Sequence, residues 1–376
     1  MHRSLVSLAR TRLQSKSLSI SHPSPRIAAT AAISCRRPYA IHSPSPPIHQ
    51  VFNRRTKWLQ KERAASNAEL SREADYLKEE VAARLCDRLL DIKRTYPLAM
   101  DLGANSCNIA RALVRPNPDP DPSQPTSEPL SARIGRLIAA ESSRTLLYRD
   151  ADLPLWSPPP SSSPSEGGLE AGALDLVREV LSDEETLPYG PDTFDLVLSS
   201  LSLHWINDLP GLLAQINSVL KPDCAFVGAM FGGDTLFELR TSLQLAEQER
   251  RGGISPHVSP LADVRDVGGL LQRAGFKMLT VDVDDIIVDY PDMFALMQDL
   301  QAMGESSAVL GREMGGIRRD VLLAGDAIYR ELHGNEDGSV PATFRMIYMI
   351  GWKEGKDQAK PLPRGSGQVN LKDVLE

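Results

Sequence analysis

The stretch from residue 96 to residue 113 constrains the fold of this chain more than any other. Three apolar residues, 98–100, lead into Asp101 and Gly103, and apolar residues then recur at helical spacing over 109–113. This order predicts a buried strand, a tight turn and a helix. Doubly wound α/β sheets build a nucleotide site from that unit, with a carboxylate and a glycine between strand and helix.

The predicted turn departs from the glycine-rich form of such sites. Asn105 and Cys107 stand where two further glycines would be expected. Each adds a side chain at a point where the backbone should approach the ligand closely. Asparagine tolerates left-handed backbone and cysteine is small, so the turn still permits binding.

Strands and helices alternate along the rest of the chain. This alternation predicts a doubly wound, seven-stranded and mostly parallel sheet with helices on both faces. Thr235 and Glu238 have the spacing of a capping box at a helix start. The expected strands are 96–100, 133–140, 174–181, 194–199, 225–230, 278–290 and 343–352, and the expected helices are 62–94, 109–113, 209–220, 235–249, 261–274, 291–303 and 320–332.

Proline-rich segments set the expected domain limits, because proline removes a backbone donor and fixes φ. Residues 40–61 are predicted to be a linker, and residues 62–355 to form one domain that starts with a helix. Two proline-rich insertions, at about 115–130 and 157–172, interrupt this domain. A polar tail is expected over 356–376.

The first 39 residues have the composition of a mitochondrial transit peptide. They hold seven Lys or Arg residues, and no acidic residue occurs before Glu62. Arg37, Tyr39 and Ala40 resemble a matrix-protease site, which predicts cleavage after Tyr39. The alternative is a basic tail with no targeting role.

The remainder of the chain is acidic. Without those seven residues, 35 basic residues face 49 acidic ones, a net charge of −14. Such a body is unsuited to general nucleic-acid binding, which depends on clustered positive charge. The four cysteines form no CxxC pair, so neither a zinc site nor a disulfide framework is indicated.

Three successive predicted strands end in carboxylates, namely Asp101, Glu141 and Asp183. In open α/β sheets the ligand lies outside the carboxyl ends of the strands. Glu141 could accept both ribose hydroxyls of a nucleoside, and Asp183 the exocyclic amine of an adenine. The chain has no GxxxxGK[ST] phosphate loop, so a cationic nucleoside such as S-adenosylmethionine suits this acidic lining. Each acid taken alone has an alternative role as a helix cap or a solvated surface group.

These residues resemble the class I, Rossmann-like S-adenosylmethionine-dependent methyltransferases. The resemblance rests on Asp101-Leu-Gly103, Glu141, Asp183-Glu-Glu185-Thr-Leu-Pro188 and Asp192-Thr-Phe-Asp195. It implies S-adenosylmethionine as the cofactor. The residues expected to contact the cofactor are Asp101, Gly103, Asn105, Glu141, Asp183, Glu184 and Ser200.

Longer motifs are more specific and resemble the mitochondrial complex I assembly factor 5 family, also called the arginine hydroxylase of complex I. These motifs are Asp75-Tyr-Leu-Lys-Glu-Glu80, Ser199-Ser-Leu-Ser-Leu-His204-Trp205-Ile-Asn-Asp208-Leu-Pro210, Met230-Phe-Gly-Gly-Asp234-Thr-Leu-Phe-Glu238-Leu-Arg240 and Asn335-Glu-Asp-Gly-Ser-Val-Pro341-Ala-Thr343. The core of that family is similar to the O-methyltransferases that act on malonyl-carrier protein.

The resemblance implies a protein of the mitochondrial matrix, peripheral at the inner membrane. Its expected partners are other complex I assembly factors and the complex I subunit that carries the terminal iron–sulfur cluster. The family's reaction is hydroxylation of an arginine in that subunit. The expected partners include no nucleic acid.

The catalytic candidates are His204 and Trp205, which follow the fourth strand, and Asp234, which follows the fifth. An iron oxygenase usually supplies two histidines and a carboxylate, often as HxD or HxE. His204, His257 and His333 all lack that pattern, so no metal ligand is assigned. Two other functions stay open: methyl transfer to a protein or small acyl substrate, and an assembly chaperone without turnover.

Overall fold

The computed structural model describes residues 50–115, 129–155, 174–311, 316–356 and 358, all within one unit that covers residues 39–376. The predicted transit peptide, most of the first proline-rich insertion, all of the second and the predicted tail from residue 359 lie outside these residues. None of the helices in the described ranges has the length and apolarity needed to cross a membrane.

The seven described strands form one sheet in the order β3-β2-β1-β4-β5-β7-β6. Strands β1 to β5 are parallel, whereas β7 runs antiparallel to both β5 and β6. The predicted doubly wound, mostly parallel sheet is therefore confirmed. The strands are β1 (Tyr96–Leu102), β2 (Ile134–Glu141), β3 (Asp175–Val180), β4 (Phe194–Ser200), β5 (Leu220–Phe231), β6 (Lys277–Tyr290) and β7 (Val340–Trp352).

Helices cover both faces of the sheet, and neighbouring residues of one strand reach opposite faces. Ala99 belongs to the buried cluster that includes residues of α3 (Tyr76–Leu90) and α4 (Asn108–Val114), while Met100 belongs to the cluster that includes residues of α6 (Leu209–Val219) and α8 (Val264–Arg273). The buried face of α3 carries apolar residues four apart. Burying each of these large side chains stabilises the fold by about 2 kcal/mol. The short elements α5 (Arg144–Tyr148), η1 (Leu130–Arg133) and η2 (Leu203–Trp205) complete this part.

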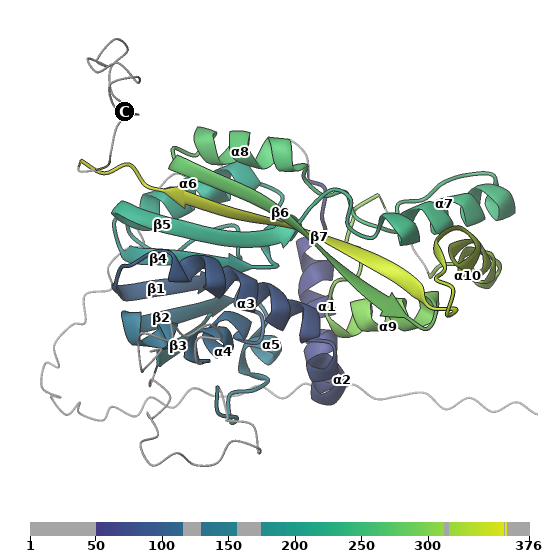
Figure 1. Ribbon diagram of the computed structural model, residues 1–376, viewed down its shortest axis with the longest axis horizontal. Coiled ribbons are helices and arrows are strands. Elements are labelled where there is room, and N and C mark those ends of the chain that lie inside the picture. The colour runs from purple at the N-terminus through teal and green to yellow at the C-terminus, as the bar shows by residue number, and fades with distance from the viewer. Residues whose placement is uncertain (1–49, 116–128, 156–173, 312–315, 357, 359–376) are drawn as a thin grey trace, which may run out of the picture. The chain divides into compact units, whose positions relative to one another are not determined.

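The antiparallel pair of β6 and β7 extends beyond the parallel strands, and three helices pack around its far end: α7 (Phe237–Arg251), α9 (Met293–Ala302) and α10 (Arg319–His333) (Figure 1). Tyr329 of α10 is fully buried there and donates a hydrogen bond to the Pro341 carbonyl. We call the far end of β6 and β7, together with α7, α9 and α10, the far lobe. It faces the carboxyl ends of the parallel strands (Figure 1).

The N-terminal part of the domain differs from the prediction. Helix α1 (Arg54–Ser66) lies largely in the predicted linker, and α2 (Ala68–Glu73) and α3 replace the single helix expected over 62–94. Asn53 and Asn67 cap α1 and α2, because each accepts a backbone N–H of the first turn. The buried face of α1 consists of two lysines and two alanines, so no apolar stripe marks it in the sequence.

Two further boundaries were predicted wrongly. Leu236, with left-handed backbone, is the N-cap of α7, and Thr235 bonds instead to the backbone of Arg345. The Glu238 carboxylate accepts hydrogen bonds from Thr343 of β7, so no capping box forms. Strand β5 starts at Leu220 rather than at residue 225, because Leu220 already pairs with Phe194 of β4 before a register shift leads to Ala225.

Candidate functional site

The chain order of the strands reverses beside β1, whose neighbours are β2 and β4. In open α/β sheets a ligand crevice lies at such a point, outside the carboxyl ends of the strands. Asp101 is level with Ala139 of β2 and Leu198 of β4. The residues that follow β1, β2 and β4 are therefore brought to the same edge of the sheet.

The turn after β1 contains only one glycine, Gly103, but its backbone follows the path of a glycine-rich turn. Gly103 has φ +70°, and a Cβ there would lie 2.1 Å from the Ser202 hydroxyl oxygen. Asn105 (φ 51°) and Cys107 (φ 63°) are also left-handed. That conformation costs about 1–2 kcal/mol for a residue with a Cβ. The Asn105 amide compensates by donating to the carbonyl oxygens of Gly103 (3.0 Å) and Ser200 (3.1 Å).

Several polar atoms beside this turn lack a hydrogen-bond partner among the described residues. They include both carboxyl oxygens of Asp101, the Ser200 hydroxyl and, after β4, Nδ1 of His204. Burial raises the pKa of Asp101 well above its ordinary value, and the charge of Glu141 raises it further. Buried polar groups without partners are rare in folded proteins and need an explanation. A ligand that donates hydrogen bonds at the ends of β1 and β4 would supply one.

Glu141, at the end of β2, is fully buried and already has donors on both carboxylate oxygens. Its Oε1 accepts from Lys61 Nζ at 2.8 Å and from the backbone N–H of Ser142 at 2.9 Å. Its Oε2 accepts from the backbone N–H of Asn105 at 3.1 Å. Burial raises the pKa of Glu141, and Lys61 opposes that rise. A nucleoside ribose at this carboxylate would have to replace the lysine.

The acids after β3 divide into an inner and an outer group. Glu184 is buried, and its Oε1 accepts from Lys61 Nζ at 2.8 Å. Although burial opposes ionisation, Lys61 and Arg54 hold the pKa of Glu184 well below its ordinary value. The Asp183 side chain is 49% exposed and pairs with Arg54 at 3.4 Å. Glu184, rather than Asp183, therefore belongs to the same buried cluster as Glu141.

Helix α1 covers this cluster and was missed as part of the site. Lys57 and Lys61 lie one helical turn apart, so they share a face of α1. Trp58 Nε1 donates to the Ser142 carbonyl after β2. Lys57 Nζ donates to the Gly304 carbonyl at 2.9 Å, after α9. Figure 1 shows α1 standing between the parallel strands and the far lobe. In the sequence, only the four-residue spacing of Lys57 and Lys61 could have indicated this face of α1, because the face is not apolar.

His204 and Trp205 meet at a carboxylate that the sequence did not indicate. Glu305 Oε2 accepts from Trp205 Nε1 at 2.7 Å and lies 3.2 Å from His204 Nε2. Burial lowers the pKa of His204, so the imidazole is neutral near pH 7. Donation from Nε2 to Glu305 then leaves Nδ1 as an acceptor. Lys57 Nζ lies 3.2 Å from the Trp205 ring centroid and 4.0 Å from Glu305.

Asp234 is placed apart from His204 and Trp205. Its side chain is 65% exposed and forms an ion pair with Arg345. Asp234 does not line the cavity that His204 and Trp205 border. Of the three catalytic candidates, His204 and Trp205 therefore lie together at the cavity, and Asp234 lies outside its lining. No group of three His, Cys, Asp or Glu side chains in the described ranges is arranged to hold a metal ion.

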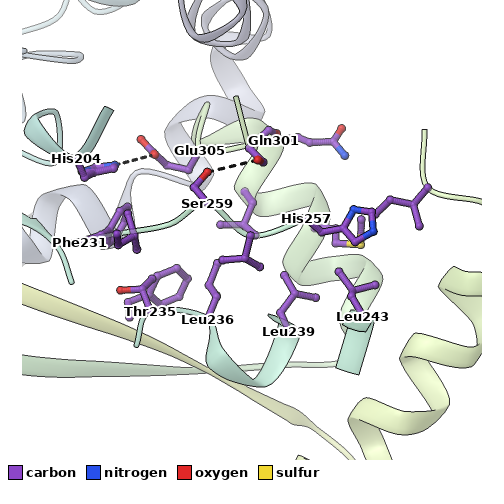
Figure 2. A pocket seen from close by; sticks show the side chains of 18 of the residues that line it. His204, Phe231, Thr235, Leu236, Leu239, Leu243, His257, Ser259, Gln301 and Glu305 are labelled. Carbon is purple, nitrogen blue, oxygen red and sulfur yellow. Dashed lines mark hydrogen bonds and ion pairs between the residues drawn. The ribbon is translucent and has the colours of Figure 1, made fainter. Parts of the chain in front are cut away.

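A cavity of about 390 Å³ opens next to Glu305, between the carboxyl ends of β4 and β5 and the far lobe. Figure 2 shows His204 and Phe231 at one end, with Leu236, Leu239 and Leu243 of the α7 region along one side. Most of its walls are apolar, and Glu305 is the one carboxylate among the described lining residues. A mainly apolar pocket with a few convergent polar groups is typical of a small-ligand or side-chain site.

Lys57 gives the site a measurable pH dependence. Burial lowers its pKa to about 7 from an ordinary 10.5, while Glu305 and Glu184 raise it and Lys61 and Lys78 lower it further. The unfolded chain therefore binds more protons between these two values, and the free energy of unfolding should rise with pH there. From pH 7 to about pH 9 we expect a gain of about 2–3 kcal/mol from Lys57.

Urea unfolding of Lys57→Met at the two pH values measures this contribution. Between the two pH values, the free energy of unfolding of the variant should rise by about 2–3 kcal/mol less than that of the wild type. Lys93→Met is the control, since Lys93 is exposed. A Lys57→Met protein with the wild-type pH slope would show that Lys57 is charged across this range in the folded state.

The chain is similar in sequence to known proteins over nearly its whole described length. A family model described as a methyltransferase domain matches residues 74–281. A Danio rerio protein named "Arginine-hydroxylase NDUFAF5, mitochondrial" is 48% identical over 326 residues, which cover 86% of this chain and 89% of that protein. The Homo sapiens protein of the same name is 45% identical over 359 residues, 90% of this chain and 93% of that protein.

A more distant relative carries a different name. The "Malonyl-[acyl-carrier protein] O-methyltransferase" of Halorhodospira halophila is 31% identical over 291 residues, covering 77% of this chain and 85% of that protein. Relatives with this fold are therefore named for two reactions, hydroxylation and methyl transfer.

Proposed function

Because the chain belongs to the mitochondrial arginine-hydroxylase family, which is the complex I assembly factor 5 family indicated by its motifs, we propose that it modifies an arginine of a complex I subunit with S-adenosylmethionine bound at the sheet edge. The observation that carries the cofactor proposal is the group of unpartnered polar atoms of Asp101, Ser200 and His204 beside the turn after β1.

The residues at this edge fit S-adenosylmethionine if one contact of α1, between Lys61 and Glu141, is broken. Asp101 and Ser200 would accept from the amino group of the methionine part, beside Gly103 and Asn105. Lys78 Nζ, 3.2 Å from the Asn105 side-chain oxygen, would face the carboxylate. Glu141 would accept the ribose hydroxyls in place of Lys61. Asp183 and Glu184 would face the adenine, with Glu184 the inner of the two.

The proposed reaction is arginine hydroxylation, as the names of the relatives say of them. Bound S-adenosylmethionine supplies an electrophilic methyl group in methyltransferases, so methyl transfer is the second candidate. The methyltransferase domain and the O-methyltransferase relative favour that candidate. In methyl transfer, His204 would accept at Nδ1 the proton that the acceptor atom loses, while Trp205 and Glu305 hold its ring. We give Asp234 no role at the reacting atoms, because it is exposed.

A non-catalytic assembly chaperone is the third candidate, and the Lys61 contact favours it, because an internal cation holds the ribose acid. In every case we place the protein in mitochondria, as the relatives are named. On the matrix side of the inner membrane it would meet other assembly factors and the subunit with the terminal iron–sulfur cluster.

Calorimetric titration of the purified chain with S-adenosylmethionine tests the cofactor proposal. We expect saturable one-to-one binding. Mass spectrometry of the partner subunit from a deletion strain and from a complemented strain then reads the reaction. One added oxygen on an arginine supports hydroxylation, and one added methyl group supports methyl transfer. No binding at millimolar ligand, with assembly still dependent on the protein, would leave the chaperone function.

A further inference from the structure

We propose that the cavity beside Glu305 is the subsite for an arginine side chain of the protein substrate, with Glu305 as the carboxylate that faces the guanidinium. This inference rests on the proposed function in one respect, namely that the modified residue is an arginine. It adds where that side chain binds and which group recognises it.

The cavity adjoins the cofactor edge of the sheet. His204 and Trp205 line it and follow β4 within five residues of Ser200. On the opposite side, Lys78 Nζ bridges the Asn105 side chain (3.2 Å) and the Met303 carbonyl (2.8 Å), two residues before Glu305. The same lysine thus ties the turn after β1 to the loop that carries Glu305. A side chain in the cavity would reach towards the proposed cofactor.

The charge of the cavity selects a cation. Glu305 is ionised at any physiological pH: burial opposes ionisation, but Lys57 and the hydrogen bond of His204 hold the pKa of Glu305 at about 2. Its Oε2 is taken by Trp205 and His204, whereas its Oε1 has no hydrogen-bond partner among the described residues. One carboxylate oxygen is therefore left for a ligand at the wall of the cavity.

The walls suit the stem of an arginine. Leu236, Leu239 and Leu300 supply apolar contact along the length of the cavity. Ser259 adds a hydroxyl group near Glu305, and Gln301, whose amide points away from Glu305, also lines the cavity (Figure 2). A guanidinium is planar, always charged and weakly hydrated, so it loses less than an ammonium when it enters such a site. An apolar stem with a planar cationic head matches both features.

Lys57 does not remove the need for this ligand. Its ammonium group donates to the carbonyl oxygens of Gly304 (2.9 Å) and Ser306 (3.1 Å) and lies above the Trp205 ring. At 4.0 Å from Glu305 it is beyond hydrogen-bond length. Lys57 is also not one of the residues that line the cavity. It lies behind the carboxylate and leaves the cavity side open.

Fluorescence-anisotropy binding of three labelled peptides tests the subsite without any turnover. The peptides are identical except for a central arginine, citrulline or norleucine. Citrulline keeps the shape of arginine and removes its charge, and norleucine keeps only the stem. We expect the wild-type chain to bind the arginine peptide at least tenfold more tightly than either of the others. Equal affinity for the three peptides, or no binding at millimolar concentration, overturns the proposal.

Two variants locate the recognition. Glu305→Gln should lose at least tenfold in affinity for the arginine peptide. Leu239→Trp, which fills the cavity and keeps Glu305, should abolish binding of all three peptides. Glu331→Gln, on the exposed face of α10, is the matched control. Wild-type arginine preference in either cavity variant overturns the proposal, and if Glu305→Gln does not fold, Leu239→Trp decides.

The two proposals fail separately. Absence of S-adenosylmethionine binding with the arginine preference intact would contradict the cofactor and support the subsite. Cofactor binding and arginine modification in Glu305→Gln at the wild-type level would contradict the subsite and support the function.

Discussion

Replacing Lys61 with methionine is expected to lower the free energy of unfolding by about 3–5 kcal/mol at neutral pH. Lys61 Nζ lies 2.8 Å from a carboxylate oxygen of Glu141 and 2.8 Å from one of Glu184, and all three side chains are at most 4% exposed. Without the lysine, two buried carboxylates would face one another with no shared cation. Breaking a buried ion pair on one side is costly, because the remaining charge keeps its desolvation penalty.

The loss in Lys61→Met should depend on pH in a defined direction. The variant should hold a proton on one of the two carboxyl groups, so that the pKa of that group in the folded state lies above its ordinary value. The folded state then binds more protons than the unfolded state, and stability falls as pH rises. Urea unfolding at pH 5 and pH 8 measures this, and we expect the smaller loss at pH 5.

Two further variants control that experiment. Arg63→Met removes an exposed cation of α1 and should change the free energy of unfolding by less than about 0.5 kcal/mol. Glu184→Gln added to Lys61→Met removes one of the facing charges and should restore part of the loss. Equal stability of wild type and Lys61→Met at both pH values would contradict the buried cluster.

Replacing Glu141 with alanine is expected to weaken S-adenosylmethionine binding about 100-fold, which is about 3 kcal/mol. In the proposed complex both ribose hydroxyls donate to this carboxylate, and a hydrogen bond to a charged acceptor contributes about 1.5–3 kcal/mol. The ribose and Lys61 would compete for Oε1 of Glu141. Glu141 therefore contributes both to the ligand-free protein, through Lys61, and to the cofactor complex, through the ribose.

Calorimetry on the purified variant measures the change, with circular dichroism to establish that it is folded. Asp152→Asn, which alters an exposed acid after α5, should bind as wild type does. An affinity for S-adenosylmethionine within twofold of wild type in Glu141→Ala would sink the ribose assignment. The assignment of Asp101 to the methionine end would survive that result.

Apolar periodicity predicted most of the sheet because its central strands, among them β1, β4 and β7, are largely buried on both faces. The run at 194–199 and the alternation of strands and helices were sufficient for the seven strands and their mainly parallel direction. Element ends were less accurate. Thr235 and Glu238 had the spacing of a cap, but contacts with Arg345 and Thr343, more than 100 residues later, decided their bonding.

Only those residues of the candidate site that lie at the end of a strand could be predicted from the sequence. Asp101, Gly103 and Glu141 follow directly from strand ends, because parallel strands bring their carboxyl ends to one edge. Glu305 and Lys57 carry no such signal. They are titratable side chains on a loop and on a helix without an apolar stripe, and their burial depends on partners from other elements.

The sequence by itself determined the doubly wound sheet, the turn after β1 and the acids at the strand ends, because local apolar spacing and turn chemistry act within a few residues. Only the tertiary structure decided that α1 covers those acids and that Lys61 bridges Glu141 and Glu184 across 80 and 123 residues of chain. The physical reason is that a buried ion pair is favourable only when folding brings both charges together and removes water. A local pattern in the sequence does not show that Lys61 and the two carboxylates come within hydrogen-bond distance of one another.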